Sequence, residues 1–314
     1  MESIAVSQLS VRRRDVLAVD SVSFVARAGE VTVLLGPNGA GKTTTVETLE
    51  GYLRPEQGSV RVLGLDPLHQ RSELTPMLGV MLQEGGIYPP MAPARAISLF
   101  ASYYADPLSV DELLGIVGLN EVAGVPAKRL SGGQRRRLAL ALALVGRPRV
   151  VFLDEPTAGV DPEGRLAIRA VIERLRDQGV CILLTTHELE EAERLADHLV
   201  LLRAGAVVAD GTPAELLAGA DEIRFVAAVG LPTEELAARL SAVVREERPG
   251  EYRVARKPDP AALAGVTGWL AERGVALDEL RGGRRRLEEV FLELLVDEAQ
   301  PRAEVPGRRE RRRR

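Results

Sequence analysis

The residues best suited to chemistry lie in a glycine-rich run near the N-terminus, Gly36-Pro37-Asn38-Gly39-Ala40-Gly41-Lys42-Thr43. The run fits a phosphate-binding loop, in which glycines let several backbone N–H groups approach a β-phosphate. The helix expected to begin at Lys42 adds the positive end of its dipole. We expect Lys42 to reach the β- and γ-phosphates of a nucleotide and the Thr43 hydroxyl to ligate Mg²⁺, with Thr44 beside them.

Two adjacent carboxylates, Asp154 and Glu155, follow the apolar run Val150 to Leu153. If that run is a buried parallel strand, the carboxylates lie at the sheet edge where α/β folds bind ligands. Asp154 is then expected to hold Mg²⁺ through water, and Glu155 to polarise the attacking water as a general base. Without the phosphate-binding loop, an acidic pair at a strand end would be the simpler interpretation.

The run Leu130-Ser131-Gly132-Gly133-Gln134-Arg135 reproduces the LSGGQ signature of the ABC ATPases, and the chain resembles that family from Ser3 to about Leu217. Ser131 and the amides of Gly132 and Gly133 stand at the start of a predicted helix, which favours anion binding. In the family this site, including Gln134, binds the γ-phosphate of ATP held by the other subunit. The resemblance therefore implies a head-to-tail homodimer with two shared ATP sites.

The same resemblance assigns three further residues by their order along the chain. Gln83 looks like the Q-loop residue that touches Mg²⁺ and the attacking water, and His187 looks like the switch histidine that supports Glu155. Asp161 looks like the D-loop aspartate at the dimer seam. Taken alone, a glutamine or histidine at a strand end is usually structural; the ordered set of motifs favours the functional interpretation.

The segment Leu9 to Arg14 departs from the family, which usually has an aromatic residue, often in a Tyr-Gly pair, that stacks on adenine. Arg13 falls nearest that position, and a guanidinium plane can stack on a base. We expect Arg13 to contact adenine with Val19 as a second wall. Selectivity for ATP over GTP stays open.

The expected elements form an α/β fold. Antiparallel strands are predicted near Ile4 to Leu9 and Val16 to Val25, and buried strands at Val31 to Leu35, Val150 to Leu153 and Val180 to Leu184; helices are predicted at Lys42 to Leu49, Ala94 to Tyr104, Ser109 to Val117 and Arg136 to Val145. The fold class is a phosphate-loop NTPase core with a mainly parallel sheet, an antiparallel β subdomain and a helical insertion.

Three parts are expected along the chain. Residues 1–218 form the nucleotide-binding domain with a helical subdomain at about 84–147, and residues 219–298 form a small C-terminal α+β domain. In that appendage the patterns predict strands at Glu222 to Val229 and Glu251 to Arg256, and helices at Glu234 to Val244, Pro260 to Arg273 and Leu287 to Leu295. Residues 299–314 are expected to be a disordered arginine-rich tail. The arginine side chains of this tail could bind anionic lipid head groups. A run of like charges is, however, more often a solvated and disordered tail.

Composition narrows the class of protein. The net charge is −4 although the last seven residues are strongly basic, so the rest of the chain is more acidic still and a poor candidate for nucleic-acid binding. The single cysteine, Cys181, lies in an apolar run and fits a reducing cytoplasm. No apolar run approaches the ~20 residues that span a bilayer, so we expect a soluble protein that a partner holds at the membrane.

The resemblance implies that ATP and Mg²⁺ are the cofactors and that a separate transmembrane permease is the partner, at the cytoplasmic face of a bacterial membrane. Tyr88 and Met91 are candidates for contact with the permease, although both would also fit the helical subdomain's own core. The Leu287 to Leu292 segment, Leu-Glu-Glu-Val-Phe-Leu, resembles exporters of the multidrug and daunorubicin-resistance type, which implies export of a drug, antibiotic or lipid-like molecule.

Three alternatives stay open. An import subunit would carry the same cassette, and a drug-sequestering module would need an apolar pocket in the appendage. A non-transport ABC protein of translation or DNA repair would usually carry two cassettes or a long coiled coil between the phosphate loop and the signature. The chain has one cassette, and Lys42 and Ser131 lie too close in sequence for such a coiled coil.

Overall fold

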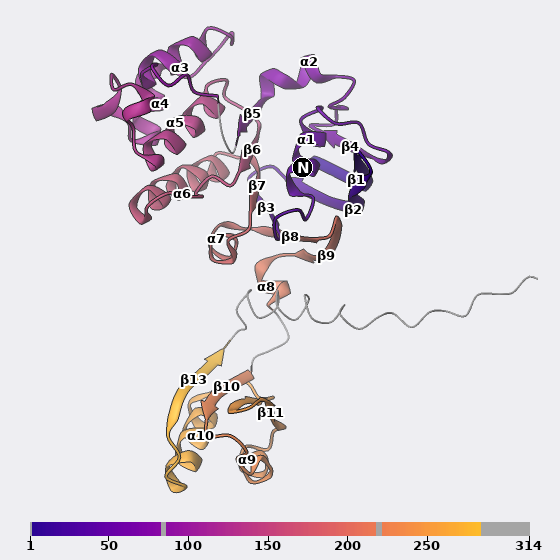
Figure 1. Ribbon diagram of the computed structural model, residues 1–314, viewed down its shortest axis with the longest axis vertical. Helices are drawn as coiled ribbons and strands as arrows, with labels where there is room; N and C mark the ends of the chain where they lie inside the picture. Colours follow the sequence, from indigo (N-terminus) through magenta and orange to yellow (C-terminus); the bar gives the residue numbers. More distant parts are fainter. Residues whose placement is uncertain (1, 83–85, 218–221, 284–314) are drawn as a thin grey trace, which may run out of the picture. The chain divides into compact units, whose positions relative to one another are not determined.

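A computed structural model of the chain describes residues 2–82, 86–217 and 222–283 (Figure 1). The described residues fold into two compact units, which divide between Pro213 and Ala214. Gln83, the helix predicted at Leu287 to Leu295 and the arginine-rich tail lie outside the described residues. Within the described residues, no helix combines the length and the apolar character that crossing a bilayer requires.

The first unit is built on a six-stranded sheet in the order β5-β6-β7-β3-β8-β9. Its strands are β5 (Leu78–Met81), β6 (Val150–Asp154), β7 (Cys181–Thr186), β3 (Val31–Leu35), β8 (His198–Arg203) and β9 (Ala206–Gly211). The first five run parallel, and β9 pairs antiparallel with β8. Every residue of β3 and β7 is buried, because layers cover both faces of the sheet. The predicted parallel core is confirmed.

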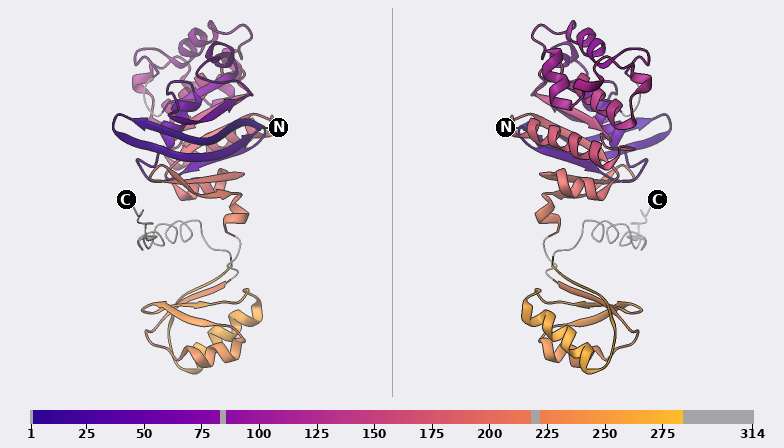
Figure 2. Two further views of the ribbon diagram at one scale, coloured as in Figure 1. Left: turned by 90° about the vertical axis from the view of Figure 1, so that its right-hand side faces the viewer. Right: turned by 90° about the vertical axis from the view of Figure 1, so that its left-hand side faces the viewer.

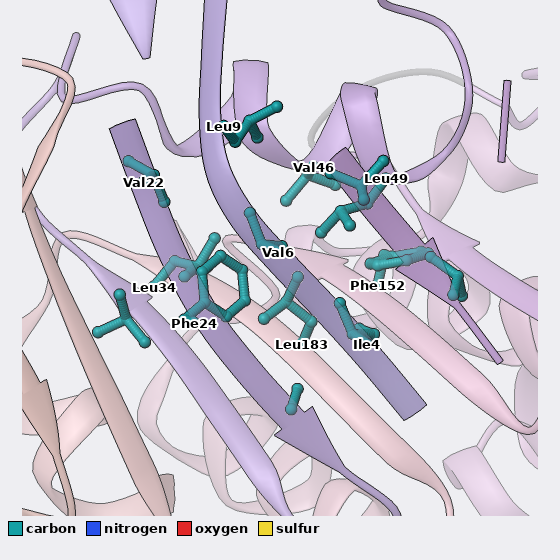
Figure 3. Packing of buried hydrophobic residues seen from close by; sticks show 14 of the residues in the cluster. Ile4, Val6, Leu9, Val22, Phe24, Leu34, Val46, Leu49, Phe152 and Leu183 are labelled. Carbon is teal, nitrogen blue, oxygen red and sulfur yellow. The ribbon is translucent and has the colours of Figure 1, made fainter. Parts of the chain in front are cut away.

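A second sheet of three antiparallel strands has the order β2-β1-β4, formed by β1 (Glu2–Arg13), β2 (Val16–Arg27) and β4 (Gln57–Val62). Figure 2 shows the long β1–β2 ribbon lying across one side of the first unit. Between the two sheets lies a core that also includes α1 (Lys42–Leu49). Figure 3 shows its side chains: Val6 and Phe24 from the antiparallel sheet, Val46 from α1, and Phe152 and Leu183 from the parallel sheet. This packing anchors the helix that follows the glycine-rich loop.

Helices complete the first unit. They are α2 (Arg71–Leu74), α3 (Pro93–Ala101), α4 (Val110–Val117), α5 (Gly132–Leu144), α6 (Pro162–Asp177) and α7 (Leu189–Leu195), with short 3-10 turns at Thr75–Met77, Asn120–Val122 and Ala127–Arg129. Helix α5 contacts α3, α4, α6 and β5, so it joins the helical region to the sheet. It begins four residues before the predicted start at Arg136, because Ser131 caps its N-terminus.

After α8 (Pro213–Leu216), the second unit contains β10 (Glu222–Ala227), α9 (Thr233–Leu240), β11 (Val244–Arg248), β12 (Glu251–Val254), α10 (Pro260–Glu272) and β13 (Leu277–Gly283). The antiparallel sheet order β11-β12-β10-β13 with this element order is the split β-α-β, ferredoxin-like topology. Leu236 of α9 and Val266 of α10 pack into one core with Phe225 and Tyr252, so both helices cover the same sheet face (Figure 2).

One sequence prediction in this unit is wrong, and two strands, β11 and β13, were not predicted. The helix expected to reach Val244 ends at Leu240, because Ser241 takes a left-handed conformation with φ 49° and the chain turns into β11. The strand β13 was not predicted, since its sequence Leu-Asp-Glu-Leu-Arg-Gly-Gly lacks the apolar and β-branched residues typical of strands.

Candidate nucleotide site

A pocket of about 230 Å³ lies where the glycine-rich loop joins β3 to α1. It is lined by Ala18, by the loop from Asn38 to Thr44, and by Asp154 and Glu155 at the end of β6. Because β3, β6 and β7 are parallel, their carboxyl ends meet at one edge of the sheet, where α/β folds bind ligands. The structure thus brings together the loop and the two carboxylates that the sequence placed far apart.

Glycine is required at two positions of the loop. A Cβ on Gly36 would lie 2.2 Å from the backbone oxygen of Leu202 in β8, and a Cβ on Gly41 would lie 2.6 Å from that of Ala18. Gly41 also has a φ of 101°, which L-residues with side chains rarely adopt. The loop can therefore approach β8 and β2 this closely only because Gly36 and Gly41 have no side chain.

Lys42 is held inside the loop. Its Nζ donates to the backbone oxygens of Gly36 at 2.7 Å and Pro37 at 3.1 Å, and only 7% of the residue is exposed. Burial lowers the pKa of Lys42, while the charges of Glu155 and Asp154 act in the opposite direction. The ammonium is thus fixed by neutral carbonyls and faces two carboxylates across the pocket.

Both acidic residues are held from β7. Thr185 donates a hydrogen bond through Oγ1 to Asp154 Oδ1, and its backbone oxygen accepts from the Glu155 backbone N–H at 3.0 Å. Glu155 has a φ of 46°, a left-handed conformation that is uncommon outside glycine. Such strain persists where neighbouring contacts enforce it and is often found at active sites.

His187 contacts Glu155 directly. Its Nδ1 lies 2.7 Å from Glu155 Oε1, with the imidazole side chain 45% exposed and the Glu155 side chain 11% exposed. The strand β7 ends at Thr186, so His187 extends from the same sheet edge as Asp154 and Glu155. A half-exposed imidazole on a buried carboxylate can both orient the carboxylate and contact a ligand from the solvent side.

The signature residues lie at the N-terminus of α5. Ser131 Oγ accepts from the Gln134 N–H at 3.1 Å, and Gln134 Oε1 accepts from the Ser131 N–H at 2.9 Å, which completes a capping box. A Cβ on Gly133 would lie 2.9 Å from Asp161 Oδ1, so the glycine lets the helix start approach Asp161. Among the described residues, those that line the pocket around Lys42 do not include Ser131, Gly132, Gly133 or Gln134.

The expected adenine wall stays a prediction at Arg13 and is wrong at Val19. Arg13 forms an ion pair with Glu47 of α1. Val19, in contrast, is fully buried in the core between the two sheets, so it cannot face a base. Its neighbour Ala18 lines the pocket instead, because successive residues of a strand point to opposite faces.

Three supporting residues were not predicted from the sequence: Thr185, which holds Asp154; Arg165, which pairs with Glu188 next to His187; and Glu191, which bonds Thr186. Threonine in a strand and charged residues in helices are common, and only the folded chain brings them to the site. Thr185 alone offered a hint, since a polar residue in a continuous apolar run must find a hydrogen-bond partner once buried.

Comparison with known proteins agrees with this geometry. A family model described as ABC transporter matches residues 19–158. The daunorubicin resistance ATP-binding protein DrrA3 of Streptomyces coeruleorubidus is 34% identical and covers 94% of this chain and 96% of its own. The Nod factor export ATP-binding protein I of Ralstonia nicotianae (strain ATCC BAA-1114 / GMI1000) is also 34% identical, with 93% of each chain covered.

Among solved structures, the ATP-binding subunit of an ABC transporter superposes with a TM-score of 0.62 at 27% identity, over 68% of this chain and 91% of that one. The present chain carries the phosphate-binding loop, the acidic pair at the end of β6 and the signature at the start of α5. The chain therefore belongs to the family of ABC transporter ATP-binding subunits, ATPases that bind ATP and use its hydrolysis to power transport.

Proposed function

We propose that this chain binds MgATP at two shared sites of a homodimer and powers export of a drug, antibiotic or lipid-like molecule through a separate permease. The observation that carries the proposal is the pocket in which Lys42, Asp154 and Glu155 face one another, with His187 on Glu155. The chain would then lie at the cytoplasmic face of a bacterial membrane, held there by its permease.

In this proposal the loop amides and Lys42 bind the β- and γ-phosphates. The Thr43 hydroxyl and the Asp154 carboxylate are hard oxygen donors in one pocket, and they fit Mg²⁺, which keeps several waters and needs few protein ligands. Gln83 remains a third candidate for this ion. Bound there, Mg²⁺ would neutralise phosphate charge.

Glu155 is the group that acts on the attacking water. It would accept a hydrogen bond from that water and orient it toward the γ-phosphate, as a general base at a phosphoryl-transfer site does. His187 holds the Glu155 carboxylate through the 2.7 Å contact at Nδ1, and its other ring nitrogen would be available to the nucleotide.

The shared sites follow from the position of the signature. Ser131 and Gly132 are exposed at the N-terminus of a 13-residue helix, where the dipole and backbone amides favour an anion. They do not line the pocket of their own chain among the described residues. A second copy in head-to-tail arrangement would supply the missing half of each site, with Asp161 near the seam.

A groove of about 560 Å³ in the helical region supports a permease contact. Its lining includes Tyr88, Met91, Arg95 and Leu99, and Tyr88 is 66% exposed. An exposed tyrosine beside apolar side chains is typical of a binding surface. We therefore keep Tyr88 and Met91 as the permease-contacting candidates. The export direction rests on the two relatives named for daunorubicin resistance and Nod factor export, which match over more than nine tenths of each chain.

The catalytic assignment is tested with Glu155→Gln, which keeps the size of the side chain and removes its basicity. Purified wild-type chain and variant are compared for phosphate release and for mass by gel filtration with light scattering in MgATP. We expect turnover to fall about 10²- to 10⁴-fold and an ATP-dependent dimer to accumulate. Normal turnover in the variant would remove Glu155 from its role.

The shared-site model has its own test. Lys42→Ala should be inactive because its phosphate loop is damaged, and Ser131→Arg because its signature is blocked. A mixed dimer keeps one intact site, formed by Lys42 of one copy and Ser131 of the other. Equal mixing should restore roughly a quarter of wild-type turnover if subunits exchange freely and sites act independently. A mixture as inactive as its components would exclude sites shared in this way.

Export is tested in cells that express the chain with a candidate permease. Accumulation of a fluorescent anthracycline should fall with the wild-type chain and not with Glu155→Gln or with either protein alone. Faster uptake of the compound into the cell would instead support an importer.

A further inference from the structure

Buried charge outside the catalytic set is concentrated at the start of α7. Glu191 is 1% exposed, and its carboxylate accepts hydrogen bonds from Thr157 Oγ1 and, at 2.8 Å, from Thr186 Oγ1. Thr157 lies two residues after Glu155, and Thr186 directly precedes His187. One carboxylate thus connects the segment that carries Glu155 to the segment that carries His187.

A second polar link runs beside the first. Arg165 of α6 donates to both carboxylate oxygens of Glu188, at 2.6 and 3.1 Å, and its Nε donates to the backbone oxygen of Val160 at 3.0 Å. Val160 precedes Asp161, and Glu188 follows His187. The residues on either side of His187 are therefore tied to the chain between Glu155 and Asp161.

Burying an apolar side chain at the start of α7 would cost less free energy than burying the Glu191 carboxylate does. Burial raises the pKa of Glu191 against the opposing effect of its two threonine donors, so the site disfavours the charged form. Breaking a buried polar network leaves unpaired groups, while an apolar replacement of the whole network is often tolerated. A carboxylate between two hydroxyls has directional geometry that an apolar contact lacks, which suits a group whose task is to hold two segments in register.

We propose that Glu191, bridging Thr157 and Thr186, is a positioning residue that keeps His187 on Glu155, with the Arg165–Glu188 pair extending the same linkage to the segment before Asp161. The inference rests on the proposed roles of Glu155 and His187. Glu191 does not line the nucleotide pocket among the described residues, so its effect must pass through the two segments it joins.

The test uses the full chain and four variants. Glu191→Ala removes both hydrogen bonds, and Thr157→Val removes one donor with little change in size. Glu191→Gln keeps one acceptor oxygen and should retain part of the activity. Glu190→Gln is the matched control, because Glu190 lies on the same helix, its side chain is 74% exposed and it pairs with the exposed Arg194 on the helix surface.

We expect kcat to fall at least about tenfold in Glu191→Ala and by less in Glu191→Gln, with KM for ATP within about threefold of wild type. Thr157→Val should lie between them, and Glu190→Gln should match wild type. A change confined to kcat is the signature of a group that acts on the reacting state rather than on nucleotide binding.

Magnetic resonance of the histidines separates positioning from general destabilisation. The chain has three histidines, so their Cε1–H signals are few, and His187→Ala identifies one of them. In Glu191→Ala and Thr157→Val the His187 signal should move, while those of His69 and His198 stay in place. His198 is a useful internal standard, since its Nε2 lies 2.6 Å from Asp210 Oδ1, away from this linkage.

Wild-type turnover in both Glu191→Ala and Thr157→Val would overturn the proposal, as would lost turnover with an unmoved His187 signal. If Glu191→Ala does not fold, Thr157→Val and Glu191→Gln decide by the same two measurements. If Glu155→Gln hydrolyses ATP normally, the proposed function fails; if Glu155→Gln is inactive and the Glu191 variants are not, this inference alone fails.

Discussion

Replacing Glu50 with glutamine should stabilise the first unit at neutral and alkaline pH. Glu50 follows α1 directly as its C-cap residue and is only 7% exposed. Burial, and secondly the charge of Asp154, raise its pKa to about 7 from 4.5, while Arg71 acts in the opposite direction. Glutamine has nearly the same shape and carries no charge, so it removes this cost without opening a cavity.

The direction of the pH dependence follows from proton binding. Between about pH 4.5 and 7 the folded state holds a proton on Glu50 that the unfolded state has lost. Stability attributable to this group therefore decreases as pH rises through that window and stays low above it. One pKa unit corresponds to about 1.4 kcal/mol, so the cost above pH 7 is on the order of 3 kcal/mol as an upper bound.

Denaturant unfolding from about pH 5 to 8 measures this difference, in chelator and without nucleotide because a cation near Asp154 would favour the Glu50 anion. The only tryptophan, Trp269, belongs to the second unit, so hydrogen exchange in α1 should report the first unit. Wild type should lose more stability across the window than Glu50→Gln, in which only other buried acids such as Glu191 contribute. The control Glu73→Gln, an exposed position on α2, should follow wild type. Parallel profiles for wild type and Glu50→Gln would refute the reasoning.

Two further predictions follow from side chains near the core and the pocket. Arg13 can stack on any base and shows no base-specific acceptor, so KM values for ATP and GTP should agree within about threefold, and Arg13→Ala should raise both; a strong preference for ATP in steady-state assays would contradict this. Cys181 is fully buried and burial raises its pKa to about 12, so a thiol reagent at about pH 8 should label it only after unfolding; rapid labelling of the native chain would show that β7 opens.

Much of the first unit could be predicted because its strands are continuous apolar runs followed by reactive residues. Val31–Leu35 leads into the glycine-rich loop, and Val150–Asp154 ends in the acidic pair, so local pattern and chemistry agree. The same reasoning was wrong at Val19, where a wall residue was expected. Because side chains alternate along β2, Val19 is buried and Ala18 lines the pocket. An alanine has no feature in the sequence that would predict contact with a base.

The second unit was harder to predict because its sheet has one covered face. Half-buried Arg224 and Val226 alternate with buried Ile223, Phe225 and Ala227 in β10, and the strand β13 has charged residues and glycines at most positions. Such strands depend on partners that are distant in sequence, so their own residues carry a weak signal. The exposed residue Ser241, with its left-handed φ, marks where α9 ends and the chain turns toward β11.

The motifs predicted which groups do chemistry, whereas the structure shows what holds them. Asp154 is held by Thr185, His187 lies on Glu155, and Glu191 joins the segments behind both. A threonine or glutamate at these supporting positions cannot be recognised from the sequence around it. Its role depends on a hydrogen-bond partner that is distant in sequence, as Thr157 is 34 residues from Glu191. Errors of about 1 Å in such support can cost roughly a hundredfold in rate. Variation in turnover between chains with identical motifs is therefore expected to arise in residues like these.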